Sequence, residues 1–429
     1  MHVPASGRRR GLSLIGAAFG VSQYPKLWLN SFIWGLNFLT YGMAQGWLIL
    51  ELTDSPAMVG VAPGIMGVTV LVLGPFGGLL ADRFDRRLLL LITQVFGASM
   101  VFGLGLLVVL DMVQLWHVFT VAAFQGVGRA VQFPARGGYT YDLVGRSLIT
   151  NALALQFLAI YLAAIGGPLL GGFILDQLNA GVLFMILGAL VFLGSMLLLT
   201  MPSPPKREQL YGNFLRNLTE GITFAMRDRQ MRTVFWVVLF TELLGFSFLF
   251  MLPVMVRDVL HQDATALGYL SAAWGAGGVL TTLTISMRGD ITARGWLFMG
   301  AAVIMGIFLL LFSFSTTLLL SIALLFGAGA AGVVYDIMGG ALLQTLAPDH
   351  MRGRLIGLHS TLFSGVMLGS FGLGFIAEVR SAPFAIAIAA TIVAVNALRM
   401  APVASAISRR SADNGEAASG SIATAGHPT

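Results

Sequence analysis

The sequence predicts an all-α membrane protein with about twelve transmembrane helices, arranged as two related six-helix bundles. Three observations support this fold class. The chain is apolar and poor in charge, it contains about twelve apolar runs long enough to cross a bilayer, and nearly all of its basic residues fall on one side of those runs.

The composition is that of a chain surrounded by lipid. Of 429 residues, 57% are hydrophobic and only 10% are charged, whereas soluble domains carry about 25% charged residues. The 53 glycines suit helices that pack closely within a membrane. The chain has no cysteine, which excludes disulfides, thiolate metal sites and a cysteine nucleophile. We expect no metal and no cofactor.

Twelve apolar segments lie between the charged clusters, and each is close to the length of about 20 residues that crosses the hydrocarbon core. They lie near 27–50, 58–80, 88–110, 114–133, 148–175, 179–200, 232–256, 266–287, 295–314, 318–344, 355–378 and 383–400. The longest polar stretch separates six spans from six. We therefore expect a cytoplasmic lead-in (1–26), an N-terminal bundle (27–200), a cytoplasmic linker (201–231), a C-terminal bundle (232–400) and a disordered cytoplasmic tail (401–429).

The basic residues predict the orientation of the chain. With the N-terminus inside, 22 of the 25 Lys and Arg residues, Arg136 among them, fall on the cytoplasmic side, which is the positive-inside pattern. Arg257 and Arg380 fall outside, and Arg129 lies within the fourth span. We expect a multi-pass protein of a bacterial inner membrane with both termini cytoplasmic. The net charge of +6 is then a topological signal, and no nucleic-acid partner is expected.

The linker contains a four-residue repeat of apolar side chains. Leu210, Phe214, Leu218 and Ile222 recur at this spacing among Arg and Glu residues, which favours an amphipathic helix on the inner membrane surface. A plain tether between the bundles is the alternative.

A charged loop joins the second and third spans. An acidic residue at the inner end of one helix lies beside three arginines there, so ion pairs could break and reform as the helices slide. The residues of this motif, which the resemblance described next implies to be a cytoplasmic gate, are Gly78, Asp82, Arg83, Arg86 and Arg87. Simple anchoring of the loop is the alternative.

The string from Gly78 to Leu90 resembles the signature loop of the major facilitator superfamily, in which Gly-x-Leu-Ala-Asp-Arg precedes Gly-Arg-Lys. Asp85 stands where the second Gly is usual, a departure seen in the secretion-effector branch. Phe133-Pro134-Ala135-Arg136 and Leu346-Ala347-Pro348-Asp349 look like the part of that branch that contains the enterobactin exporter and macrolide efflux proteins. The resemblance implies the major facilitator fold, with spans one, four, seven and ten lining a central cavity, and a latch formed by Asp82 and the arginines.

The fifth span contains a proline between glycines. Pro168 removes one helical hydrogen bond, and Gly167, Gly171 and Gly172 permit a bend and close packing. The pattern resembles the motif associated with antiporters of the superfamily, which implies export by antiport.

Three acidic or arginine residues lie away from the ends of predicted spans, where a charge costs about 2.5–3.5 kcal/mol on insertion scales. Glu242 lies in span seven, Asp336 in span ten and Arg129 in span four. If their access to water alternates, Glu242 or Asp336 could load and release a proton in each cycle, with Arg129 as a neighbouring charge. A static ion pair is the alternative.

Polar residues also recur along one face of the first span. Asn37, Tyr41 and Gln45 are spaced four residues apart. Together with Gln125 of span four and Tyr335 of span ten, they are our candidates for contact with the substrate.

These features predict a proton-coupled exporter of a small amphiphilic molecule, such as a drug or a siderophore, working by alternating access about a site between two halves. Since one chain supplies both halves, we expect a functional monomer. An importer or uniporter of a metabolite or lipid is the alternative within the class, and a non-transporting sensor or scaffold is a more remote one. The six histidines are scattered, so we expect no enzymatic activity.

Overall fold

The computed structural model describes residues 16–203, 214–288, 293–348, 351, 355, 362 and 365–410. Within these ranges the chain forms helices with short connections and no β-strand, which confirms the all-α class. Most of the predicted lead-in and tail, and the middle of the predicted linker, lie outside the described residues.

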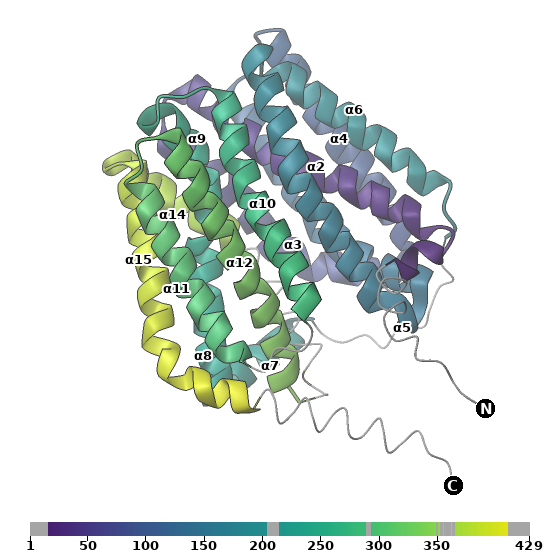
Figure 1. The fold of residues 1–429 in the computed structure, drawn as a ribbon. Helices are drawn as coiled ribbons and strands as arrows, with labels where there is room; N and C mark the ends of the chain where they lie inside the picture. Colours follow the sequence, from purple (N-terminus) through teal and green to yellow (C-terminus); the bar gives the residue numbers. More distant parts are fainter. Residues whose placement is uncertain are drawn as a thin grey trace, which may run out of the picture. The chain divides into compact units, whose positions relative to one another are not determined.

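The first six spans occupy five continuous helices after the short helix η1 (Ala17–Gly20). They are α2 (Tyr24–Thr53), α3 (Pro56–Arg83), α4 (Arg86–Val109), α5 (Leu115–Gln177) and α6 (Ala180–Leu199) (Figure 1). Helix α5 has 63 residues and a kink at Gly145, so it supplies both the fourth and the fifth span.

The second half begins with α7 (Phe214–Arg227), a helix in the segment where the four-residue spacing predicts one. The seventh span then runs through α8 (Arg229–Phe240), η2 (Thr241–Gly245), η3 (Ser247–Met251), α9 (Leu252–Val254) and η4 (Met255–Val259). The remaining spans are α10 (Ala264–Arg288), α11 (Arg294–Ser313), α12 (Leu318–Leu346), α14 (Gly365–Val379) and α15 (Ala382–Met400).

Twelve transmembrane segments follow from this order, as the sequence predicts. Eight helices of the described part are long and apolar enough to cross a membrane, and α14 is a shorter apolar helix. The chain stays helical beyond α15 through η5 (Ala401–Val403) to Arg410. Residues 401–410, assigned to the tail from sequence, are therefore helical, and Ala404 and Ile407 are buried.

The contacts divide the chain into two compact units. The N-terminal unit comprises Met1–Gln45 and Thr69–Leu210, and the C-terminal unit comprises Gly46–Val68 and Tyr211–Thr429. In the N-terminal unit α4 packs against α6 and α5, and in the C-terminal unit α12 packs against α10 and α11 while α11 packs against α15. The end of α2 and the start of α3 thus belong to the C-terminal unit.

A close helix contact attaches this segment to its unit. A side chain at Gly60 would collide with the backbone of Ser370, and the Ser370 hydroxyl donates to the Gly60 carbonyl oxygen over 3.2 Å. Glu378 also accepts hydrogen bonds from the Ser55 hydroxyl (2.8 Å) and the Ala57 N–H (3.1 Å) at the start of α3. Small residues and a capping carboxylate therefore hold α3 against α14.

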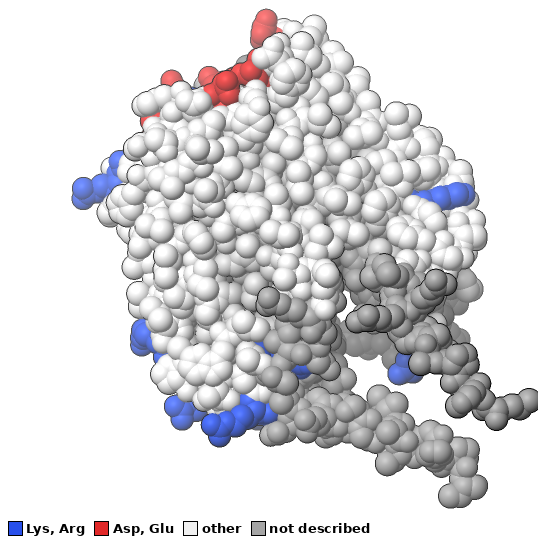
Figure 2. All heavy atoms as spheres, viewed as in Figure 1, with Lys and Arg blue, Asp and Glu red and all other residues white. Residues whose placement is uncertain are grey.

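Charge is segregated along the C-terminal unit. In the view of Figure 2, most Lys and Arg of this unit gather at its lower end, near α7 and α8, with one further basic group on its upper left side, whereas Asp and Glu lie along the upper end. The flanks between these ends are almost free of charge, as expected for a surface in contact with lipid tails.

Arg136, predicted to follow the end of the fourth span at 133, lies inside helix α5 instead, and the side of the membrane on which it lies stays a prediction. Helix α5 continues past the predicted end at 133 until the kink at Gly145, and Arg136 is only 8% exposed within the unit. The polar string after Pro134 has the composition of a loop, but Arg136 is held in the helix by hydrogen bonds from its Nη1 to Ser31 and Asn30, described below.

Candidate functional site

Two carboxyl groups lie inside the C-terminal unit, as predicted. Glu242 is completely buried on η2, and its Oε2 has no hydrogen-bond partner among the described residues. Asp336 is half-buried on α12, and its Oδ1 likewise has none within the described part of the chain. The two groups are close enough for their charges to interact. They form an intramembrane pair of titratable groups from two different spans.

The backbone around Glu242 departs from a regular α-helix. Residues Thr241–Gly245 form a π-helical turn, and Ser247–Met251 form a 3₁₀ segment. The Ser247 hydroxyl lies 2.6 Å from the carbonyl oxygens of both Leu243 and Val366, so it can donate to either carbonyl at the break. Short π-helical turns in α-helices occur frequently at functional sites, and here the turn carries the buried carboxyl group.

Tyr335 supports the carboxyl pair. Its ring is 1% exposed and stacks on Phe298 with a centroid distance of 5.1 Å. Its hydroxyl lies 3.4 Å from Glu242 Oε1 and 3.4 Å from the Val238 carbonyl oxygen. The sequence predicts Tyr335 in the substrate pathway, and this contact stays a prediction. In the structure its hydroxyl lies beside the Glu242 carboxyl group.

Arg129, the third coupling candidate, lies in the N-terminal unit. Its guanidinium carbon is 4.1 Å from the ring centroid of Phe38 and 5.8 Å from that of Trp34. Its Nη1 is buried and has no hydrogen-bond partner among the described residues. The predicted pairing of Arg129 with Glu242 or Asp336 stays a prediction.

The polar stripe of span one lies on one helical face but is buried in the unit. Asn37, Tyr41 and Gln45 are 8%, 4% and 5% exposed. The Gln45 amide donates to the Tyr41 hydroxyl over 2.9 Å, and the Tyr41 ring packs against Phe184 of α6. Gln125 is half-buried on α5. Their contact with a substrate stays a prediction.

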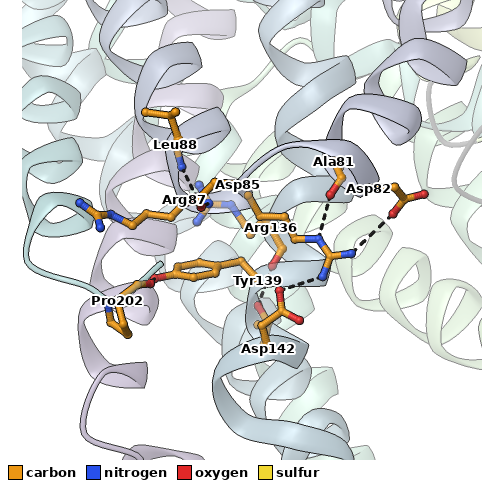
Figure 3. A network of polar contacts seen from close by, with 11 residues as sticks. Ala81, Asp82, Asp85, Arg87, Leu88, Arg136, Tyr139, Asp142 and Pro202 are labelled. Carbon is orange, nitrogen blue, oxygen red and sulfur yellow. Dashed lines mark hydrogen bonds and ion pairs between the residues drawn. The ribbon is translucent and has the colours of Figure 1, made fainter. Parts of the chain in front are cut away.

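The predicted gate loop is organised around Arg86, whose partners Ala81, Asp82 and Asp142 are labelled in Figure 3. Arg86 Nη1 is 2.8 Å from Asp142 Oδ2, Arg86 Nη2 is 3.5 Å from Asp82 Oδ1, and Arg86 Nε donates to the Ala81 carbonyl oxygen over 3.0 Å. The shorter ion pair therefore involves Asp142 of α5, which the sequence analysis missed. The one signal in the sequence for this role of Asp142 is its position a few residues before Gly145-Arg146.

The other residues of the loop fix the surrounding helix ends. Asp85 accepts hydrogen bonds from the backbone N–H groups of Arg87 (2.8 Å) and Leu88 (3.3 Å), so it caps α4. Arg87 donates to the Leu199 carbonyl oxygen at the end of α6. Arg83 ends α3, and Gly78 faces open space.

The antiporter-like motif forms a close contact within the N-terminal unit. A side chain at Gly167 or Gly171 would collide with Thr40 of α2. Pro168 and Gly172 are buried beside them in α5, whose backbone stays helical at this point. The predicted close packing is confirmed here.

Sequence analysis also missed a buried polar network around Arg136. Its Nη1 donates to Ser31 Oγ (2.6 Å) and Asn30 Oδ1 (3.1 Å), and Asn30 and Gln94 exchange amide hydrogen bonds of 2.9 and 3.1 Å. Isolated amides in otherwise apolar spans were the available signal, because such groups need a partner in lipid. Among the described residues, no cluster of three or more metal-ligating side chains occurs.

Solved structures share the architecture. The nucleoside transporter NupG matches with a TM-score of 0.67 at 16% identity, covering 90% of this chain and 99% of that one. A bacterial homologue of the human lysosomal transporter Spinster, solved inward-facing and unoccupied, matches with a TM-score of 0.67 at 14% identity, covering 91% and 98%. Twelve spans in this fold, together with a match of residues 17–418 to the sequence profile of a transmembrane secretion family, define a multi-pass membrane transporter of the major facilitator type.

The chain belongs to the transmembrane secretion effector family, whose sequence profile matches residues 17–418. It is similar to the MFS-type transporter YfiS of Bacillus subtilis (strain 168), at 27% identity over 407 residues that cover 88% of this chain and 89% of that one. It is also similar to the enterobactin exporter EntS of Shigella flexneri, at 24% identity over 337 residues, covering 78% and 80%.

Proposed function

We propose that this protein exports a small amphiphilic molecule across the bacterial inner membrane by proton antiport, with Glu242 and Asp336 as the groups that carry the proton. Access to the transport pathway alternates between the two sides of the membrane. A single chain is the functional unit, and both termini lie in the cytoplasm.

The carboxyl pair inside the C-terminal unit is the observation that supports coupling to protons. An ionised carboxylate in the membrane interior costs about 2.5–3.5 kcal/mol on insertion scales, so its charge state depends on its access to water and to donors. Glu242 Oε2 and Asp336 Oδ1 lack hydrogen-bond partners among the described residues, and the two groups interact electrostatically. A change of access that hydrates this pair would release a proton, and renewed burial would favour uptake.

Export as the direction is supported by the relatives and by the motif of the fifth span. The family is named for secretion, and EntS is an exporter. The Gly167 and Gly171 contact with Thr40 retains the close packing of the antiporter-like motif. Siderophores and drugs are the first compounds to test, because the resemblance includes exporters of both kinds.

A substrate screen in everted membrane vesicles tests this function. Vesicles that contain the protein, with an imposed pH gradient acid inside, are incubated with a panel of siderophores, drugs and metabolites, and uptake is measured by mass spectrometry. We expect at least one compound to accumulate only while the gradient lasts. Two results would contradict pH-driven export. One is uptake that stays the same after the pH gradient is collapsed, and the other is no uptake of any compound across a broad panel.

A further inference from the structure

We propose that Arg129 and Arg136 form an anion-binding site on α5, and that the transported molecule is an organic anion whose acidic group is attached to an aromatic or similarly apolar body. This substrate class rests on the transport function proposed above.

Both arginines border the same pair of aromatic rings. Trp34 and Phe38 of α2 stack with a centroid distance of 5.6 Å and an interplanar angle of 8°. The Arg129 guanidinium lies 4.1 Å from the Phe38 centroid, and that of Arg136 lies 5.3 Å from the Trp34 centroid. Both rings are half-buried, so two cations and two partly accessible aromatic faces converge on one place.

Hydrogen-bonding capacity at this place is unused. Arg129 Nη1, Arg136 Nη2 and Gln132 Oε1 are buried and have no partner among the described residues. Residues 129, 132 and 136 follow the spacing of one helical face. Because a buried donor without a partner loses its hydration without compensation, a ligand that accepts from these guanidinium groups would be bound favourably.

The positive charge is also uncompensated within the unit. Buried charges in proteins are normally paired, yet neither guanidinium has a carboxylate partner among the described residues of the N-terminal unit. Asp142, the acidic residue of the same helix that is nearest in sequence, is already paired with Arg86 at 2.8 Å. An anionic ligand would supply the missing counter-charge.

The two arginines have different surroundings. Arg136 is held by Ser31 and Asn30, and Asn30 is held in turn by Gln94 and by the Gly194 carbonyl oxygen. Arg129 makes ring contacts with Phe38 and Trp34 but no hydrogen bond to any described residue. Arg136 thus offers a donor fixed by hydrogen bonds, and Arg129 offers donors whose hydrogen-bonding capacity is unused.

The chemistry of these groups identifies the ligand class. A planar guanidinium binds a carboxylate or a similar oxyanion through two parallel hydrogen bonds, and the half-buried rings of Trp34 and Phe38 beside it favour a flat apolar body. A neutral or cationic compound of the same shape would keep the stacking and lose the charge-assisted hydrogen bonds.

Matched naphthalene probes test the site directly. The full-length protein in lipid nanodiscs is titrated with radiolabelled 2-naphthoate, 2-naphthamide and 2-naphthylmethylammonium, and bound probe is measured after subtraction of empty nanodiscs. We expect the anion to bind at least about tenfold more tightly than the other two. Arg129→Gln should weaken naphthoate binding by about tenfold and leave naphthamide binding unchanged. The naphthoate affinity of Arg129→Lys should lie between those of the wild type and Arg129→Gln. The control Arg399→Gln, at an exposed position, should bind naphthoate as the wild type does.

Equal binding of the three probes, absence of naphthoate binding, or full naphthoate affinity in Arg129→Gln would overturn the anion site. The preference of the wild type among the probes is decisive even if a variant does not fold. The titration uses one pH and no gradient, so its result is independent of proton coupling. Absence of an anion preference would contradict the anion site without contradicting proton antiport. Failure of the vesicle screen would contradict proton antiport without contradicting the anion site.

Discussion

Asp85 occupies a position where the superfamily's signature loop usually has glycine, and the structure gives this residue a specific task. Its carboxylate accepts from the N–H groups of Arg87 and Leu88 and so satisfies two donors at the start of α4. The loop thereby gains a helix cap, and Arg86 remains available for Asp142 and Asp82. The replacement of the usual glycine by Asp85 thus stabilises the loop locally.

Removing this cap should destabilise the protein. Asp85→Ala is expected to cost about 0.5–2 kcal/mol, whereas Asp85→Asn, which can still accept the hydrogen bonds, should cost less. Asp85→Gly should cost only a few tenths of a kcal/mol relative to Asp85→Asn. The measurement is the thermal midpoint of the purified protein in one detergent. Equal midpoints for the wild type and Asp85→Ala would show that the cap carries no stability.

Among the helices, α5 and the seventh span depart most from regular geometry, and each departure has a local cause. In α5 the kink depends on Gly145, whose φ of 72° and ψ of −179° lie in a region that essentially only glycine adopts. In the seventh span the π-helical turn places Glu242 in the interior. Both departures are found at the transmembrane segments that carry the candidate residues.

Replacement of Gly145 should strain the connection between the fourth and fifth spans. A Cβ at this position meets open space, so the effect of Gly145→Ala comes from backbone conformation alone. We expect a loss of about 1–3 kcal/mol. Gly137→Ala in the same helix also meets open space but has no positive φ, so it should be neutral or slightly stabilising. The measurement is the thermal midpoint of both variants under the same conditions. Equal midpoints for Gly145→Ala and Gly137→Ala would show that a side chain at position 145 causes no backbone strain.

Across the whole molecule, sequence reasoning succeeded where hydrophobicity determines structure. The twelve spans are present, and the described helices begin and end within a few residues of most predicted bounds. Glu242, Asp336 and Arg129 were found because charge is rare in apolar segments. The packing role of Gly167 and Gly171 followed from their size and from the proline between them.

Other features depend on contacts that a linear pattern does not contain. Arg136 follows a proline and precedes two glycines, which is the composition of a loop. Its burial depends on hydrogen bonds to Ser31 and Asn30 of another helix, and Asn30 is held in turn by Gln94. The Asp142 pairing with Arg86 depends on how α5 packs against the loop. No proline near Glu242 in the sequence predicts the π-helical turn. The turn is accompanied by tertiary contacts of Gly245 and Ser247.

The central claim is that Glu242 and Asp336 couple transport to protons. Its most direct test uses proteoliposomes and a substrate identified in the vesicle screen, with wild type, the Glu242→Gln/Asp336→Asn double variant, and a Glu51→Gln control at an exposed carboxylate. The double variant should lose net transport driven by a pH gradient and keep exchange of labelled for unlabelled substrate at equal pH, whereas the control should do both. Full pH-driven transport by a folded double variant would contradict the account.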